Sequence, residues 1–97
     1  MDLPTYEIFA SQLRETFSLA VGDSSLDVTL VDARRRPARV VAGIRAEPFT
    51  LYFKCGNPVV LPQKLYPFSN AKLGKMDIFI VPIGREKDGV VYEAVFN

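Results

Sequence analysis

The feature that most constrains the fold is a pair of apolar runs near the carboxyl end of the chain. They cover residues 75–83 and 90–96, and the charged stretch 84–89 separates them. Both runs are rich in β-branched and aromatic residues, and a glycine stands at each end of the charged stretch. This pattern predicts two antiparallel strands joined by a surface loop. Pro82 cannot donate a hydrogen bond to a neighbouring strand, so its end of the first strand should lie at a sheet edge or a bulge.

The alternation of side chains along these strands predicts which face is buried. In the second strand the core face should carry Val90, Tyr92, Ala94 and Phe96, and the other face Val91, Glu93, Val95 and Asn97. In the first strand it should carry Met76, Ile78, Ile80 and Pro82. If these faces share one core, the numbers of paired residues sum to an even number, as for Ile80 opposite Ala94.

The other face of the first strand is also apolar, apart from Asp77 at its start. It consists of Phe79, Val81 and Ile83. A strand that is apolar on both faces needs cover on both. We expect this second face to be covered either by an amino-terminal helix, through Phe9, Leu13 and Phe17, or by another copy of the chain.

The rest of the chain predicts one helix and several short strands. Apolar residues recur at helical spacing over residues 4–17, with Thr5 as N-cap. Alternation then predicts a hairpin of residues 17–21 and 26–31 around a turn at 22–25, and a strand at 49–54. Residues 64–68, which include Pro67, can form at most an edge strand. We therefore predict a mainly β (α+β) fold, a small antiparallel β-barrel or roll of five to six strands with one amino-terminal helix. A two-sheet sandwich is the alternative.

Length and composition suggest one domain, residues 1–97, with a single modest core. No apolar run approaches the roughly 20 residues needed to cross a bilayer, and the amino terminus lacks the layout of a signal peptide. Cys55 is the only cysteine, which excludes an internal disulfide and fits a reducing compartment. These features lead us to expect a cytoplasmic protein without membrane contact.

The residue types argue against an enzyme. The sequence contains no histidine, so Cys55 lacks the usual base for a nucleophile, and the scattered carboxylates do not have metal-ligand spacing. Asp77 and Glu93 are expected to lie several residues apart on the ladder, too far for an acid–base pair. No glycine-rich phosphate loop follows a strand. We expect no cofactor, no metal and no catalytic residue.

An arginine run is the strongest charge anomaly. Five of the twelve basic residues stand between positions 34 and 45, and the other seven are outnumbered by eleven acidic residues. We expect this segment to be exposed and mobile, because its arginines lack local partners for burial. An exposed basic segment can contact an acidic protein surface or, through phosphates, nucleic acid. The candidate residues are Arg34, Arg35, Arg36 and Arg39.

The chain resembles an uncharacterised family of bacterial domains of about this length. The resemblance covers most of the chain and is carried by the 17–19 strand, the 48–53 strand, and the segments 61–66, 73–74, 79–84 and 92–97. The arginine run is not part of that pattern, and Lys64 stands where a turn-favouring glycine is usual. Genes of this family often lie near those of phage-tail-collar-like proteins. The resemblance therefore implies a role in a tail-like or surface assembly.

Together these observations favour a non-enzymatic protein-interaction or structural accessory module, with a protein partner or a second copy of the chain. The interaction would use Phe79, Val81 and Ile83 or the arginine run. Two alternatives stay open: a small-ligand-binding β-barrel with an internal pocket, and a nucleic-acid contact through residues 34–39.

Overall fold

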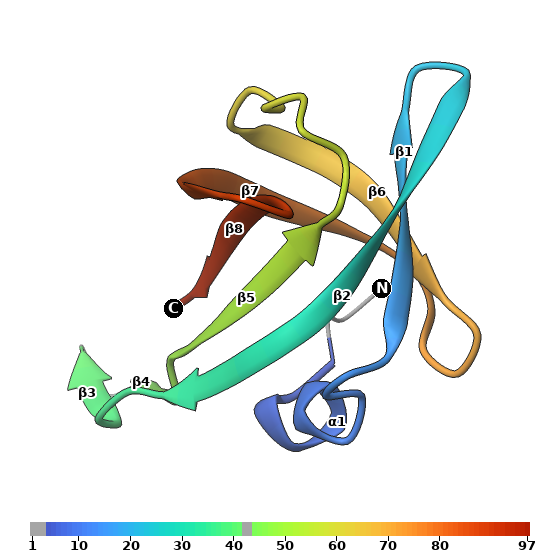
Figure 1. Cartoon of the computed structure of the whole chain (residues 1–97). Coiled ribbons are helices and arrows are strands. Elements are labelled where there is room, and N and C mark those ends of the chain that lie inside the picture. Colours follow the sequence, from blue (N-terminus) through green and yellow to red (C-terminus); the bar gives the residue numbers. More distant parts are fainter. Residues whose placement is uncertain (1–3, 42–43) are drawn as a thin grey trace.

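The computed structural model describes residues 4–41 and 44–97, and the side chains of residues 39–46 are not described. Six antiparallel strands close into a barrel in the order β1-β2-β5-β8-β7-β6. The barrel strands are β1 (Thr16–Val21), β2 (Ser24–Arg35), β5 (Phe49–Cys55), β6 (Lys64–Asn70), β7 (Gly74–Glu86) and β8 (Gly89–Phe96). A short helix, α1 (Tyr6–Ala10), lies at one end, and β3 (Arg39–Val41) and β4 (Ile44–Ala46) form a separate two-stranded sheet (Figure 1). The predicted barrel with one amino-terminal helix is confirmed.

The carboxyl-terminal hairpin forms in the predicted register. Val81 pairs with Glu93 and Pro82 with Tyr92, and both pairs sum to an even number. The register then shifts between Pro82 and Gly84, so a bulge lies beside the proline, as expected. The strands extend further into the charged stretch than predicted, to Glu86 on one side and from Gly89 on the other.

Large side chains fill the barrel. The largest that are fully buried are Tyr92, Phe9, Phe17, Phe53, Phe68, Leu19, Leu30, Leu51, Ile78, Ile80, Val28 and Val90. Three phenylalanine rings meet near the centre, with centroids 5.4 Å apart for Phe17 and Phe53 and 5.1 Å apart for Phe53 and Phe68. Such tilted contacts stabilise aromatic pairs beyond the burial of their area.

The helix is much shorter than predicted. Thr5 is the N-cap, as expected, but α1 ends at Ala10 and Phe17 belongs to β1. Arg14 has a φ of 72°, a left-handed conformation that ends the helical path. Its amide donates to the Leu30 carbonyl oxygen over 2.8 Å, so the chain already runs beside β2 at this point. The position of Phe17 in the apolar pattern fits both a helix and a strand. Pairing of β1 with β2 stabilises the strand.

The hairpin predicted around residues 22–25 is also present, as β1 and β2. Val21 pairs with Ser24, which leaves Gly22 and Asp23 as a two-residue turn. Gly22 has a φ of 58°, as the first central residue of a type II′ turn requires. β2 continues to Arg35, and Arg34 pairs with Thr50 across β5. The first two residues of the arginine run therefore belong to a barrel strand, which corrects the prediction that the whole run is a mobile segment.

The loop from residue 56 to 63 closes the end of the barrel opposite α1. Leu61 is buried, and its amide donates to the Tyr92 hydroxyl over 3.0 Å. The Tyr66 hydroxyl donates to the Pro62 carbonyl oxygen over 2.7 Å. Burial raises the pKa of Tyr92 and of Tyr66, so both phenols stay protonated and available for these contacts.

Gly89 offers a direct test of the β5–β8 packing. A Cβ atom at this position would lie 2.1 Å from the Cys55 carbonyl oxygen, and its φ of 150° is unfavourable for any other residue. We expect Gly89→Ala to lower the free energy of unfolding by about 2 kcal/mol or more, since strain and a backbone clash combine. Gly84→Ala is the control, because a Cβ there meets nothing within 4 Å. Urea unfolding of both variants measures the difference, and equal stabilities would contradict this packing.

Candidate interaction surface

Several large apolar side chains stand on the outside of the barrel. Phe79 is 49% exposed and Ile83 51%, with Val81 partly buried between them on β7. Leu65 on β6, directly opposite Phe79, is 54% exposed, and Val95 on β8 is 49% exposed. We call Leu65, Phe79, Val81 and Ile83 the outer apolar face; Val95 is not part of it, because it lies beyond the end of the β7–β8 ladder and pairs with Thr50 on β5. The predicted apolar stripe of β7 is present, and Leu65 on β6 widens it.

The amino-terminal helix does not cover this face. Phe9 packs against Phe96 and Phe49, with ring centroids 5.5 and 6.0 Å away, at the end of the barrel. Phe17 lies inside the barrel, and Leu13 is itself partly exposed. The prediction that Phe9, Leu13 and Phe17 cover Phe79, Val81 and Ile83 is therefore wrong, because the helix closes the barrel end instead. Cover by a second copy of the chain stays a prediction.

A hollow of about 310 Å³ adjoins the outer apolar face. It extends across β1, β6 and β7, and is lined by Ser18, Ala20, Pro67, Phe68, Ser69, Lys75, Met76 and Asp77. The pairs Pro67–Asp77 and Ser69–Lys75 follow directly after the pair Leu65–Phe79 in the β6–β7 register. The hollow and the apolar side chains thus form one continuous surface with a charged rim.

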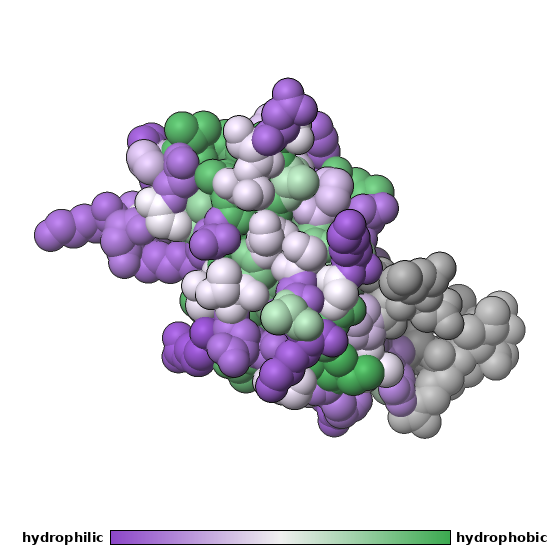
Figure 2. All heavy atoms as spheres, turned by 90° about the vertical axis from the view of Figure 1, so that its right-hand side faces the viewer, coloured by the Kyte–Doolittle hydropathy of each residue, from purple (hydrophilic) through white to green (hydrophobic). Residues whose placement is uncertain are grey.

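The space-filling view from the right-hand side of Figure 1 shows small separate groups of apolar residues among polar ones (Figure 2). Scattered exposed apolar residues are normal on a soluble domain. The outer apolar face differs because Leu65 and Phe79 are direct cross-strand partners, so their exposed areas adjoin.

Two of the arginines are exposed but already paired. The Arg34 Nε donates to Asp32 over 2.7 Å, and its guanidinium lies 5.4 Å from the centre of the Tyr52 ring. Arg35 donates to Glu7 over 2.8 Å and lies 4.6 Å from the centre of the Tyr6 ring. The hydrogen bond to Asp32 raises the pKa of Arg34. Each of these charges has a carboxylate beside it, which lowers the net charge of this region.

Arg36 has a structural position, which corrects the prediction that it is freely exposed. Its Nη2 donates to the carbonyl oxygens of Phe49 and Phe96, over 3.3 and 2.5 Å, and to Asn97 over 3.3 Å. It thus connects the ends of β5 and β8. The Arg36 Nε is buried without a hydrogen-bond partner among the described residues. Arg39 begins β3, but its side chain lies outside the described part of the chain.

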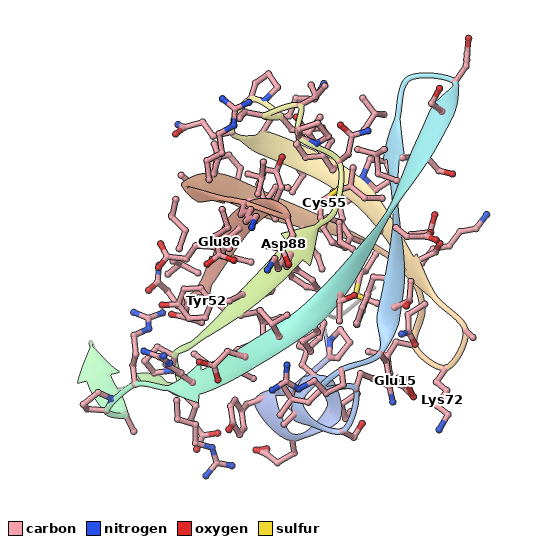
Figure 3. All side chains as sticks on the ribbon, in the orientation of Figure 1. Glu15, Tyr52, Cys55, Lys72, Glu86 and Asp88 are labelled. Carbon is pink, nitrogen blue, oxygen red and sulfur yellow. The ribbon has the colours of Figure 1, made fainter. Side chains whose placement is uncertain are left out.

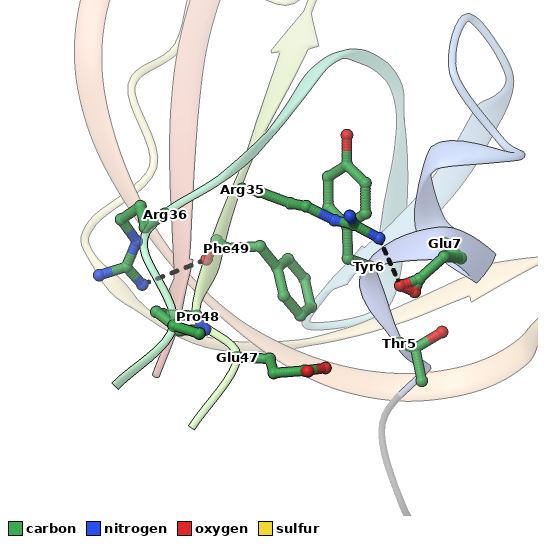
Figure 4. A pocket seen from close by; sticks show the side chains of 9 residues that line it. Thr5, Tyr6, Glu7, Arg35, Arg36, Glu47, Pro48 and Phe49 are labelled. Carbon is green, nitrogen blue, oxygen red and sulfur yellow. Dashed lines mark hydrogen bonds and ion pairs between the residues drawn. The ribbon is translucent and has the colours of Figure 1, made fainter. Parts of the chain in front are cut away.

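A second hollow, of about 490 Å³, lies beside these arginines (Figure 4). Its lining comes from the start of α1, the end of β2 and the start of β5, and includes Tyr6, Glu7, Arg35, Arg36 and Phe49. The Arg35–Glu7 ion pair and the Arg36–Phe49 hydrogen bond are drawn in Figure 4. These donors are engaged by the chain itself, which weakens this hollow as an anion site.

A closed group of ion pairs occupies the outer side of β5. The Lys54 ammonium lies 2.8 Å from both Glu86 and Asp88, which stand near each other at the β7–β8 turn (Figure 3). Hydrogen bonds to Asp88 and Glu86 raise the pKa of Lys54, and the hydrogen bond from Lys54 lowers the pKa of Asp88. Farther along β5 the Tyr52 hydroxyl donates to Glu93 over 3.2 Å, and burial, followed by this bond, raises the pKa of Tyr52.

The carboxylates considered for acid–base chemistry do not meet. Glu93 pairs with Val81, whereas Asp77 pairs with Pro67, so the two acids stand four strand positions apart, about 13 Å. Cys55 is buried in the core. In the described part of the chain, no three side chains of His, Cys, Asp or Glu form a group that can hold a metal ion. Within the same residues, no helix has the length and apolar character needed to cross a membrane.

The comparisons with known proteins concern nearly the whole barrel. Residues 4–96 match the model of DUF6916, a domain of unknown function. The chain belongs to this family. No curated protein and no solved structure gives a significant match. The DUF6916 match confirms the coarser part of the sequence resemblance, an uncharacterised small-domain family. It assigns no site to the DUF6916 domain, so the candidate surface depends on the geometry described above.

Sequence reasoning missed Leu65 and the hollow. Leu65 had a usable signal, because it alternates with Tyr66 and thus lies on the outer side of the predicted edge strand. The hollow had no local signal, since β1 and β6 are neighbours only in the folded barrel.

The arginines allow a matched test of this DUF6916 domain. We expect Arg36→Ser to lower the free energy of unfolding by about 1–3 kcal/mol, because it leaves the Phe49 and Phe96 carbonyl groups without their charged donor. Arg34→Ser and Arg35→Ser are the controls and should change it by no more than about 0.5 kcal/mol, as exposed ion pairs do. Chemical denaturation compares the three variants. A similar loss in all three would assign a structural role to the whole run.

Proposed function

We propose that the protein is a non-enzymatic protein-interaction module, a structural accessory that docks a protein partner on the outer apolar face. The observation that carries this proposal is the exposure of Phe79, Ile83 and Leu65 on adjoining strands, while the interior is filled and the helix packs elsewhere. The core of the chain is complete without these side chains, so they add no stability to the monomer while they stay exposed. Their retention in water is best explained by a partner that covers them.

The energy available from this face sets the size of the contact. Burying the exposed half of a side chain such as Leu, Ile, Val or Phe contributes about 1 kcal/mol. The three most exposed members, Leu65, Phe79 and Ile83, therefore supply about 3 kcal/mol, less than the roughly 4–15 kcal/mol that association costs. The partner must therefore also contact polar groups, which the adjoining hollow offers through Lys75 and Asp77.

The wider setting follows from the resemblance found in the sequence. That family of bacterial domains, with genes near those of phage-tail-collar-like proteins, supports a place in a tail-like or surface assembly. A small barrel with one apolar outer face suits such a role, because it can act as a rigid adaptor between larger components. A second copy of the chain is the other candidate for the partner.

The two alternatives have less support. A ligand-binding barrel needs an internal pocket, whereas fully buried side chains such as Phe53, Ile78 and Tyr92 fill this interior. A nucleic-acid contact through residues 34–39 needs free basic charge, whereas Arg34 and Arg35 each pair with a carboxylate and Arg36 holds backbone carbonyl groups.

Site-specific cross-linking in the native host tests the proposal. A photoreactive phenylalanine analogue replaces Phe79, and in the control protein it replaces Thr29, a partly exposed residue of β2. We expect a discrete cross-linked product of one partner, or of a second copy, from position 79 and none from position 29. Added unmodified protein should compete for this product, whereas the Phe79→Asp variant should not.

Circular dichroism and thermal melting must first establish that both modified proteins fold. Equal labelling from the two positions, or no discrete product from position 79, would exclude the outer apolar face as a docking surface.

A further inference from the structure

The strand pairing between β1 and β6 is the shortest among the described strands of the barrel. It contains only the pairs Ser18–Ser69 and Leu19–Phe68, whereas β6 pairs with β7 along its whole length. Beyond Leu19, residues 20–21 of β1 have a strand neighbour only in β2, and residues 64–67 of β6 only in β7. We call the space between these two segments the seam. The seam adjoins the hollow, because Ala20 and Pro67 also line that hollow.

The turn geometry shows where the backbone groups of β1 point. Val21 and Ser24 flank a two-residue turn, so they are hydrogen-bonded to each other. Because hydrogen-bonded and non-hydrogen-bonded pairs alternate along an antiparallel ladder, the N–H and C=O of Ala20, Ser18 and Thr16 point away from β2 and toward β6. The side chain of Asn70, on β6, donates to the Thr16 carbonyl oxygen over 3.2 Å, which agrees with this assignment.

Pro67 explains why the ladder stops. In a continued register Ala20 would face Pro67, and the Ala20 carbonyl group would need an N–H that proline lacks. By the same alternation, the N–H and C=O of Leu65 also point into the seam. The seam therefore presents a donor and an acceptor from each side, next to the outward side chains of Leu65 and Phe79.

We propose that an extended segment of a partner polypeptide enters this seam as an added strand, hydrogen-bonded to Ala20 on β1 and to Leu65 on β6. The proposal rests on the protein-interaction function proposed above and specifies its ligand. Unpaired backbone groups select an extended chain, because only another strand offers donors and acceptors at matching spacing. The outer apolar face selects apolar side chains at alternate positions of that segment. Asp77 and Lys75, both exposed on the rim of the hollow, favour side chains of opposite charge beside them.

The two edges of the β1–β2 hairpin supply a matched pair of variants. Ala20 and Ser25 face each other as a non-hydrogen-bonded pair, so proline at either position leaves the hydrogen bonds between β1 and β2 in place. Ala20→Pro removes the N–H that points into the seam. Ser25→Pro removes an N–H on the opposite edge of the same hairpin and serves as the control.

The probe is a random library of eight-residue peptides displayed on phage and selected on the immobilised full chain. We expect enriched peptides with apolar residues at alternate positions. A synthetic peptide of the enriched sequence should bind Ala20→Pro at least tenfold more weakly than the wild type, and Ser25→Pro within about twofold. In the wild type, hydrogen exchange at the Ala20 and Leu65 amides should slow on peptide binding, and this measurement does not depend on how well the proline variants fold.

The outcomes separate this inference from the function on which it rests. Peptides that lose affinity for Phe79→Asp but bind Ala20→Pro normally would overturn strand addition and leave docking on the outer apolar face intact. No enriched peptide, or no slowing of exchange at Ala20 and Leu65, would also overturn strand addition. The cross-linking from position 79 judges the docking surface independently.

Discussion

The packing of aromatic rings inside the barrel is the constraint on which the rest of the structure depends. Phe17, Phe53 and Phe68 fill the centre, and each end has its own closure. At one end Phe9 packs against Phe49 and Phe96, whose rings stack on each other, and at the other the Leu61 amide donates to the Tyr92 hydroxyl. The helix closes one end of the barrel and packs against the core there. It therefore cannot also cover an outer face of the barrel. Any surface left apolar on the outside is therefore available to other molecules.

The register of the carboxyl-terminal hairpin could be predicted from the sequence, because it depends on local alternation and on one short connection. The amino-terminal helix could not. The same apolar residues fit a helix through Phe17 and a strand that begins at Thr16, and the choice depends on the pairing of β1 with β2. Long-range pairing commonly overrides local propensity in this way. The left-handed backbone of Arg14 lies between the helical residues and the first residues of the strand.

In the candidate surface, too, some features could be predicted from local sequence and others depend on contacts that form only in the fold. The exposed stripe of β7 followed from side-chain alternation alone. The role of Arg36 did not, because its partners, Phe49 and Phe96, are distant in sequence and become neighbours only when β2, β5 and β8 meet. A run of arginines resembles a solvated patch from its composition. In the fold, one member holds two strand ends together while Arg34 and Arg35 lie over aromatic rings beside carboxylates.

The seam between β1 and β6 raises the question of how a barrel can keep an open edge without promiscuous association. Free edges and exposed apolar strands invite pairing with any other strand. Here Pro67 removes one donor from the β6 edge, the Gly22–Asp23 turn ends the β1 edge at Val21, and Lys75 and Asp77 charge the rim of the adjoining hollow. Each feature weakens the binding of an arbitrary strand to this edge. A segment that meets Ala20 and Leu65 in one register, and matches the rim charges, keeps its full set of contacts. If a partner strand binds there as proposed, the residues that disfavour generic strand pairing also make the seam selective.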